Sequence, residues 1–185
     1  QNNGIINHYE YIINSEGTIE IRHVLKPEGK MPLWFPRIGL TLTVSDALDQ
    51  VKWYGRGPQE NYPDRKTGYP TGIYASTVQA MYEPYLMPQD YGLRTDVRWL
   101  QLTTDKGIGL QFKMNECFNF NIYPYSTDNL TKAMYTYQLQ KQKGMTLNLD
   151  YATTGVGCTA RGVFGAYKAM PQEYRRTISI KPMMK

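Results

Sequence analysis

The sequence predicts an all-β protein built from antiparallel strands. Three observations support this class: apolar and polar residues alternate with a period of two, sixteen tyrosines favour strands, and glycines and prolines separate the alternating segments. With 185 residues, of which 41% are hydrophobic and 20% are charged, the chain is long enough for one globular domain with its own core. We therefore predict a single domain over residues 1–185, with about nine or ten strands arranged as a sandwich.

The first predicted element is a β-hairpin. A strand at 9–14 and a strand at 18–25 flank Ser15-Glu16-Gly17, a sequence typical of turns. The segment 27–36 contains three prolines and a glycine and is predicted to be a loop. A strand follows at 37–44, where apolar side chains alternate with polar ones.

The remainder of the chain continues this pattern and adds one helix. We predict a helix at 127–134, because Ser126 is a good N-cap and Asp128 suits the first turn. Leu130 and Met134 lie four positions apart and would share one face. Further strands are predicted at 51–54, 72–77, 96–103, 109–115, 118–123, 146–153 and 174–181.

Charge and composition exclude several functions. The formal charge is +5 and the pI about 9.1, but the basic residues are scattered, so we expect no nucleic-acid partner. No apolar run approaches the roughly 18 residues of a membrane span, so we expect no membrane partner. The chain has two histidines and two cysteines, Cys117 and Cys158, but the cysteines lie 41 positions apart with no Cys-x-x-Cys pair. This spacing does not fit a structural zinc site, and we predict no metal or other cofactor. Two alternatives stay open for the cysteines: one disulfide in an oxidising compartment, or two buried free thiols, which we favour.

The densest chemistry lies at 53–65, which reads WYGRGPQENYPDR. Its glycines and prolines exclude a helix or an interior strand. Glu60 and Asp64 are a candidate carboxylate pair for a glycosidase. However, Arg56 and Arg65 flank them, and a neighbouring arginine lowers the pKa of a carboxylate, whereas a general acid needs a raised pKa. We therefore interpret these four residues as a structural network, in which both carboxylates accept hydrogen bonds from the arginines or from backbone N–H groups.

No other segment predicts catalysis, so we name no catalytic residue. A serine triad needs a histidine base, and His8 and His23 both lie in the first hairpin, where His23 is expected to be a packed or edge residue. The glycine-rich stretch GVGCTARG, at 155–162, lacks the ending of a phosphate-binding loop.

The segment WYGRGPQENYPDRKTG, at 53–68, resembles the signature loop in the C-terminal domain of β-galactosidases of glycoside hydrolase family 2. Further matching segments occur in the order found in that family. They are PRIGLTLTV before the loop, then MYEPYLMPQDYGLRTDVRWLQLT at 81–103, PYSTDNLTKA at 124–133 and LNLDYATTGVG at 147–157. The resemblance extends from about Tyr9 to the C-terminus.

This resemblance implies an antiparallel β-supersandwich similar to that of galactose mutarotases, here without some N-terminal strands and therefore with an exposed edge. It also implies that the catalytic glutamates and a magnesium site lie in a separate (β/α)₈ barrel. The chain is then expected to be a soluble, non-catalytic part of a β-galactosidase, in the cytoplasm or the periplasm. Its expected partners are that barrel and, through the parent enzyme, a carbohydrate such as a β-galactoside.

In some members of the family an aromatic residue after the GVG sequence stacks on the bound sugar. The corresponding position is near Gly162, so the stacking residue is either missing or replaced by Phe164. Arg161 is expected either to donate to a sugar hydroxyl or acidic aglycone, or to be a solvated surface residue. Two other functions stay open: a free-standing mutarotase-like enzyme, which needs an acid and a base in its cleft, and a carbohydrate-binding module, which the tyrosine content permits.

Overall fold

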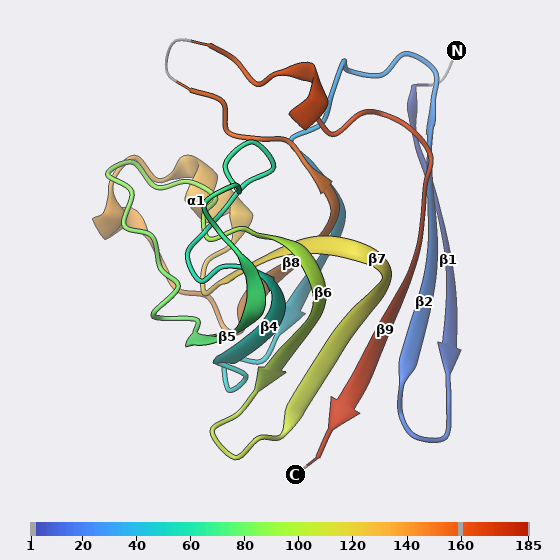
Figure 1. The fold of residues 1–185 in the computed structure, drawn as a ribbon, viewed down its shortest axis with the longest axis vertical. Helices are drawn as coiled ribbons and strands as arrows, with labels where there is room; N and C mark the ends of the chain where they lie inside the picture. Colours follow the sequence, from blue (N-terminus) through green and yellow to red (C-terminus); the bar gives the residue numbers. More distant parts are fainter. Residues whose placement is uncertain (1–2, 159–160, 185) are drawn as a thin grey trace.

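Antiparallel strands dominate the structure, a computed structural model that describes residues 3–158 and 161–184 (Figure 1). These residues form one nine-stranded antiparallel sheet, which confirms the predicted all-β class. The strands are β1 (Gly4–Ile13), β2 (Ile19–Glu28), β3 (Arg37–Val44), β4 (Gln50–Arg56), β5 (Thr71–Thr77), β6 (Arg94–Thr103), β7 (Gly109–Tyr123), β8 (Met145–Thr153) and β9 (Tyr174–Met183). The helical segments are α1 (Thr127–Lys132) and the 3₁₀ turns η1 (Thr136–Gln138) and η2 (Gly165–Tyr167).

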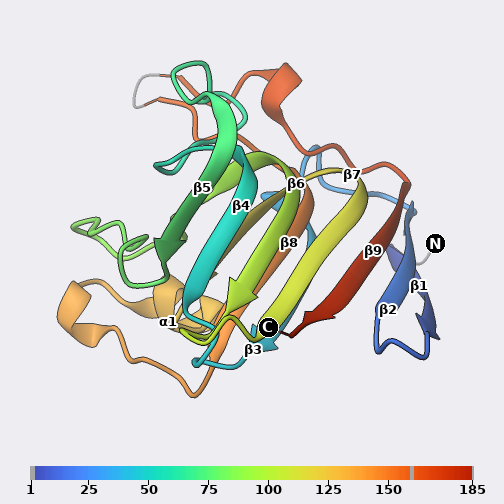
Figure 2. The same cartoon turned by 60° about the horizontal axis from the view of Figure 1, so that its bottom comes forward.

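Strand β7 connects two layers of the sheet. Its first half, Gly109–Met114, pairs with β9, whereas its second half, Asn119–Tyr123, pairs with β8. The main path runs β1-β2-β9-β7-β6-β4-β5, and β8 carries β3 behind it, which gives an open, sandwich-like arrangement (Figure 2). The two strands predicted at 109–115 and 118–123 are therefore one strand. The predicted break is wrong because the backbone stays extended through a bulge that sets residues 114–117 opposite Arg98 of β6.

The main hydrophobic core lies between these layers. Alternate side chains of the facing strands point inward and are removed from solvent, as expected for a period of two. The largest fully buried members are Trp53, Phe112, Phe118, Phe120, Leu100, Leu102, Leu147, Leu149 and Ile178.

Strand β8 is buried on both faces, because a second layer covers its outer side. Residues 145–151 are all buried. On their outward side, Asn148 donates to the Tyr123 hydroxyl and Thr146 to the Tyr125 carbonyl oxygen, and Tyr123 forms a small second core with Tyr91 and Leu130. The polar residues of β8 are consequently buried as well.

Helix α1 begins where the sequence predicts. The Ser126 hydroxyl accepts a hydrogen bond from the Asn129 N–H at 3.0 Å, which is the expected N-cap. The helix ends earlier than predicted, at Lys132, because Ala133 adopts an extended conformation. Leu130 is buried, but Met134 lies beyond the helix and is exposed, so the predicted pairing of these two side chains is wrong.

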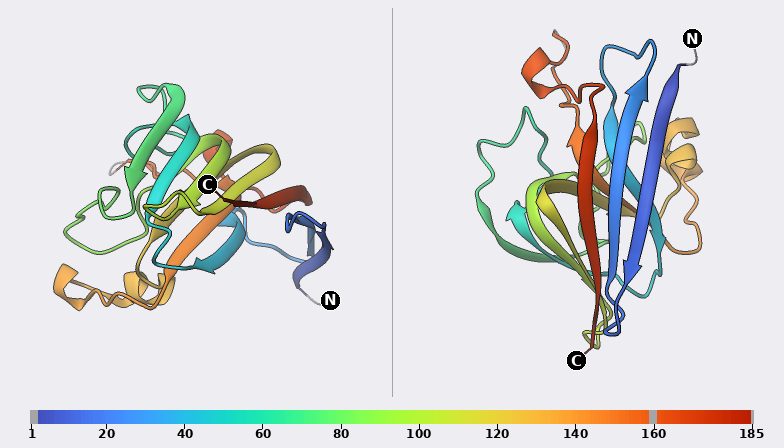
Figure 3. Two further views of the ribbon diagram at one scale, coloured as in Figure 1. Left: turned by 90° about the horizontal axis from the view of Figure 1, so that it is seen from below. Right: turned by 90° about the vertical axis from the view of Figure 1, so that its right-hand side faces the viewer.

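Strand β1 is an edge strand that pairs with β2 alone among the described strands (Figure 3). All ten of its residues are exposed. The exposed side chains include Ile5, Ile6, Tyr11 and Ile13, so this edge carries apolar groups on both faces. An exposed apolar edge of this kind is a surface that another strand or chain can cover.

Replacing Gly39 by alanine is expected to lower the free energy of unfolding by about 1–3 kcal/mol, as overpacking does. Gly39 lies where the β3–β8 register shifts, and a Cβ there would meet the Leu149 carbonyl oxygen at 2.3 Å and Asp150 Cα at 2.6 Å. Urea unfolding measures the change. Gly68→Ala is the matched control, since no described atom lies within 4 Å of its Cβ position. Equal stability of the two variants would contradict the prediction.

Candidate functional site

Two loops meet at one end of the sheet and form the candidate site. We call residues 57–70 the Glu60 loop, and residues 154–158 together with 161–169 the Gly155 loop. Both loops lie beyond the strand ends that are uppermost in Figure 1. Between them is a hollow of about 220 Å³. Its polar lining comes from Lys66, Asp96, Asn119, Thr153 and Lys168.

Glu60 is the central acceptor of the Glu60 loop, and its side chain is only 8% exposed. One carboxylate oxygen accepts from Arg65 Nη2 at 2.6 Å and from the Tyr85 hydroxyl. The other accepts from the Gly92 N–H at 2.9 Å and from the Tyr62 hydroxyl at 3.1 Å. Burial raises the pKa of Glu60, but the hydrogen bonds from Tyr85, Gly92 and Arg65 outweigh burial and lower the pKa overall. Glu60 is thus held as an anion.

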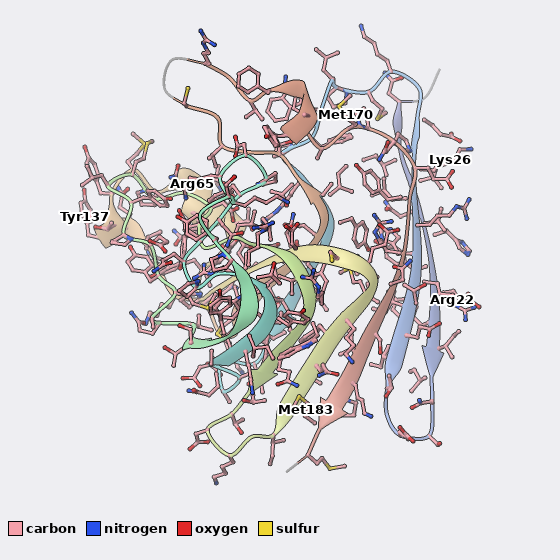
Figure 4. All side chains as sticks on the ribbon, viewed as in Figure 1. Arg22, Lys26, Arg65, Tyr137, Met170 and Met183 are labelled. Atoms are coloured by element: carbon pink, nitrogen blue, oxygen red, sulfur yellow. The ribbon has the colours of Figure 1, made fainter. Side chains whose placement is uncertain are left out.

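Asp64 links the two loops. Its carboxylate oxygens accept from the Val156 N–H at 3.0 Å and from the Gly157 N–H at 2.7 Å. Arg65, which is labelled in Figure 4, lies next to it in the chain and pairs with Glu60 rather than with Asp64. The two carboxylates therefore occupy different positions in the loop cluster: Glu60 binds side chains and backbone beneath it, and Asp64 binds the neighbouring loop.

Arg56 takes a partner that sequence reasoning missed. Its Nε donates to Asp96 at 2.6 Å, and Lys66 Nζ approaches the same carboxylate at 2.9 Å. Asp96 occupies a β-bulge in β6 with φ of 55°, and this conformation turns its side chain toward the Glu60 loop. Burial raises the pKa of Asp96, but the bonds from Arg56 and Lys66 lower it overall. A bulge depends on cross-strand register, so the alternating pattern of the strand holds no signal for it.

The two residues predicted to contact sugar stand on the outer part of the Gly155 loop. Arg161 is exposed, and its backbone exchanges two hydrogen bonds with Cys158, at 3.1 and 3.2 Å. Phe164 is 65% exposed. Both side chains are therefore available to a ligand or a partner domain.

A polar network around the buried residues Asn121, Asn148 and Asp150 lies on the outer face of β7 and β8. Asp150 accepts from Arg37 Nη2 at 2.8 Å, and Arg37 also approaches Asp90 at 3.4 Å. Asn121 donates to Asp90 at 2.9 Å and accepts from Asn148 at 2.8 Å. Burial raises the pKa of Asp150 to about 7 despite the opposing effect of Arg37. No sequence pattern predicts this network, because its residues come from four separated segments.

His23 is a packed residue. Its ring is 1% exposed and lies 2.7 Å from the Tyr151 hydroxyl and 3.0 Å from the Asn7 side-chain oxygen, and it stacks on Tyr9. Burial lowers the pKa of His23. Cys117 and Cys158 are free but exposed, so their expected burial is wrong. Cys117 lies in the β7 bulge, where the side chain is directed away from the core.

Residues 3–158 and 161–184 contain no group of three or more His, Cys, Asp or Glu side chains placed to hold a metal ion. No helix in this described part of the chain is long and apolar enough to cross a membrane.

Comparison with known proteins places this open β-sheet domain in a family. The family model described as "Beta galactosidase small chain" matches residues 2–180. A β-galactosidase of Priestia megaterium is 38% identical over 147 residues, covering 80% of this chain and 14% of that protein. One from Vibrio cholerae is 39% identical over 122 residues, covering 66% and 11%. The chain therefore belongs to the β-galactosidase small-chain family, and it spans about one seventh of the first of these relatives.

Replacing Glu60 by alanine is expected to lower the free energy of unfolding by about 1–3 kcal/mol, because buried donors lose their acceptor. Chemical denaturation measures this change. Glu16→Ala, in an exposed turn, is the matched control. An unchanged denaturation midpoint for Glu60→Ala would show that the network does not stabilise the fold.

The Asp150 network makes stability depend on pH. The folded-state pKa of about 7 lies above the unfolded value of about 3.9, so the folded chain binds the proton more tightly. This contribution is fully present below the unfolded pKa and is lost as the pH rises through about 7. Between pH 5 and 8, wild type should therefore lose stability relative to Asp150→Asn in urea unfolding. If the difference in free energy of unfolding between wild type and Asp150→Asn stays constant from pH 5 to 8, the raised pKa is contradicted. Asp105→Asn, at an exposed turn, is the control and should show no such change with pH.

Proposed function

We propose that this chain is a non-catalytic domain of a β-galactosidase, and that its two loops help to wall a substrate cleft formed with a catalytic barrel elsewhere in the enzyme. The observation that carries the proposal is the loop cluster itself. Two loops far apart in the sequence are locked together by Asp64 and present Arg161 and Phe164 outward. An anchored loop with exposed aromatic and cationic side chains suits recognition of a sugar.

The carboxylates of the cluster support a structural rather than a catalytic role. The oxygens of Glu60 are occupied by four donors, and its lowered pKa is opposite to what a general acid requires. Asp150 has a raised pKa but is 1% exposed, so no substrate can reach it. We therefore assign the acid, the nucleophile and the magnesium of the parent reaction to the barrel.

A carbohydrate-binding module is the second candidate. Tyr135 and Tyr137 stack with ring centroids 5.4 Å apart and an angle of 7° between planes, and they are 57% and 79% exposed. Exposed tyrosine faces bind sugars through apolar contact while their hydroxyls stay hydrated. A free-standing mutarotase-like enzyme has less support, since His23 is buried and hydrogen-bonded to Tyr151.

The proposal predicts that hydrolysis needs both this domain and the rest of an enzyme. In the Priestia megaterium relative, the segment matched by this chain is deleted or replaced by residues 1–185. Hydrolysis of a chromogenic β-galactoside is then compared among the intact relative, the chimera, the deletion and the 185-residue chain alone. We expect turnover by the intact relative and the chimera only.

Two results would contradict the proposal. A chimera no more active than the deletion would mean that the chain does not complete the enzyme. Turnover by the chain alone would mean that this domain contains catalytic residues. Glu60 and Asp64 would then be the first carboxylates to replace. Saturable binding of a galactoside to the isolated chain that is abolished by Tyr137→Ala would favour the binding module.

A further inference from the structure

We propose that Asp64 is a positioning residue, whose carboxylate fixes the Gly155 loop and thereby sets where Arg161 and Phe164 stand relative to a bound sugar. The link to substrate rests on the proposed function. We call the contact of the Asp64 carboxylate with residues 155–157 the Asp64 clamp, and it rests on hydrogen bonds and close packing within this chain.

Asp64 accepts hydrogen bonds from two consecutive backbone N–H groups of a segment more than ninety residues away in the sequence. Its Oδ1 accepts from Val156 N at 3.0 Å and its Oδ2 from Gly157 N at 2.7 Å. Gly157 has φ of 66°, a left-handed conformation that helps aim adjacent N–H groups at one anion. Bonds to an ionised acceptor are stronger than bonds between neutral groups, so Asp64 holds this segment more firmly than an amide or hydroxyl would.

Gly155 is shaped to admit the same carboxylate. A Cβ at this position would lie 2.3 Å from Asp64 Cγ and 2.4 and 2.5 Å from its two oxygens. Only glycine permits so close an approach. The carboxylate thus rests against one glycine and bonds to the next two residues, and the sequence Gly155-Val156-Gly157 is complementary to Asp64 in both space and charge.

Asp64 is itself held in place. It lies in a tight turn in which Tyr62 and Arg65 exchange backbone hydrogen bonds of 3.2 and 2.8 Å. The side chains of Tyr62 and Arg65 both bond to Glu60. The buried Glu60 carboxylate therefore orients the turn, the turn orients Asp64, and Asp64 orients the Gly155 loop.

A backbone hydrogen bond joins the two ends of the Gly155 loop. Gly155 N donates to Tyr167 O at 2.8 Å, which joins the two ends of the loop at its base. Arg161 and Phe164 lie between these ends and are exposed. Their placement above the base depends on how the chain leaves Gly155, and Asp64 sets that direction through Val156 and Gly157.

Amide hydrogen exchange of the 185-residue chain tests the clamp. In Asp64→Ala the Val156 and Gly157 amides should exchange about tenfold faster or more, since each loses a bond to a charged acceptor. Asp64→Asn keeps one acceptor oxygen and should show a smaller effect. Gly155→Ala should reproduce the effect by displacing an intact carboxylate. The Asn61 amide, bonded to Leu93 O at 2.8 Å, reports whether the Glu60 loop stays folded.

Two outcomes of the exchange experiment overturn the clamp. One is unchanged protection at Val156 and Gly157 in Asp64→Ala and Gly155→Ala. The other is equal acceleration at Asn61, which would mean that Asp64 supports the whole fold rather than the loop. Asp105→Asn, at an exposed turn, is the control and should leave the exchange rates of the Val156, Gly157 and Asn61 amides unchanged.

Kinetics of the chimeric β-galactosidase test the link to substrate. Asp64→Ala should raise KM about three- to tenfold with kcat within about twofold, because the loop binds sugar but does not react with it. Phe164→Ala should show the same split. If Asp64→Ala speeds amide exchange without changing KM, the proposed effect of Asp64 on substrate binding is overturned, whereas its hold on the Gly155 loop is supported. An inactive wild-type chimera would instead refute the proposed function, and the exchange result would be unaffected.

Discussion

The buried carboxylate of Glu60 is the constraint on which the candidate site depends. A charge removed from water is tolerated only when hydrogen bonds replace its hydration. Glu60 meets this condition with donors from three segments: its own loop, Tyr85 and the Gly92 backbone. The need to satisfy one anion therefore ties together segments that have no regular secondary structure. It explains how a loop rich in glycine and proline has a defined shape.

The bend of β7 has a comparable effect on the scaffold. Because one strand pairs with β9 in its first half and with β8 in its second, the two layers share a continuous backbone. The register between β6 and β7 shifts twice, and the shift between Arg94 and Val97 turns Asp96 toward Arg56 and Lys66. An irregularity of strand pairing therefore supplies a charged anchor for the Glu60 loop.

The charged groups of the site act mainly through position. Glu60, Asp64 and Asp96 each accept from two or more donors, and each is directed at a different part of the loop cluster. Preorganised loops lose less entropy on binding than flexible loops do. A loop cluster held in this way presents its exposed side chains at a fixed place, which fits the proposed function and the membership of the small-chain family.

The sequence by itself determined the all-β class, nearly all strand positions, the cap at Ser126 and the family, because these follow from local periodicity, capping and ordered motifs. It also identified Glu60 and Asp64 as members of one dense loop. Only the tertiary structure decided that Arg56 pairs with Asp96, that Asp64 reaches Gly157, and that Asp150 lies buried beside Arg37. These contacts depend on bulges, register and loop closure between distant segments, and no local pattern of residues encodes those distances.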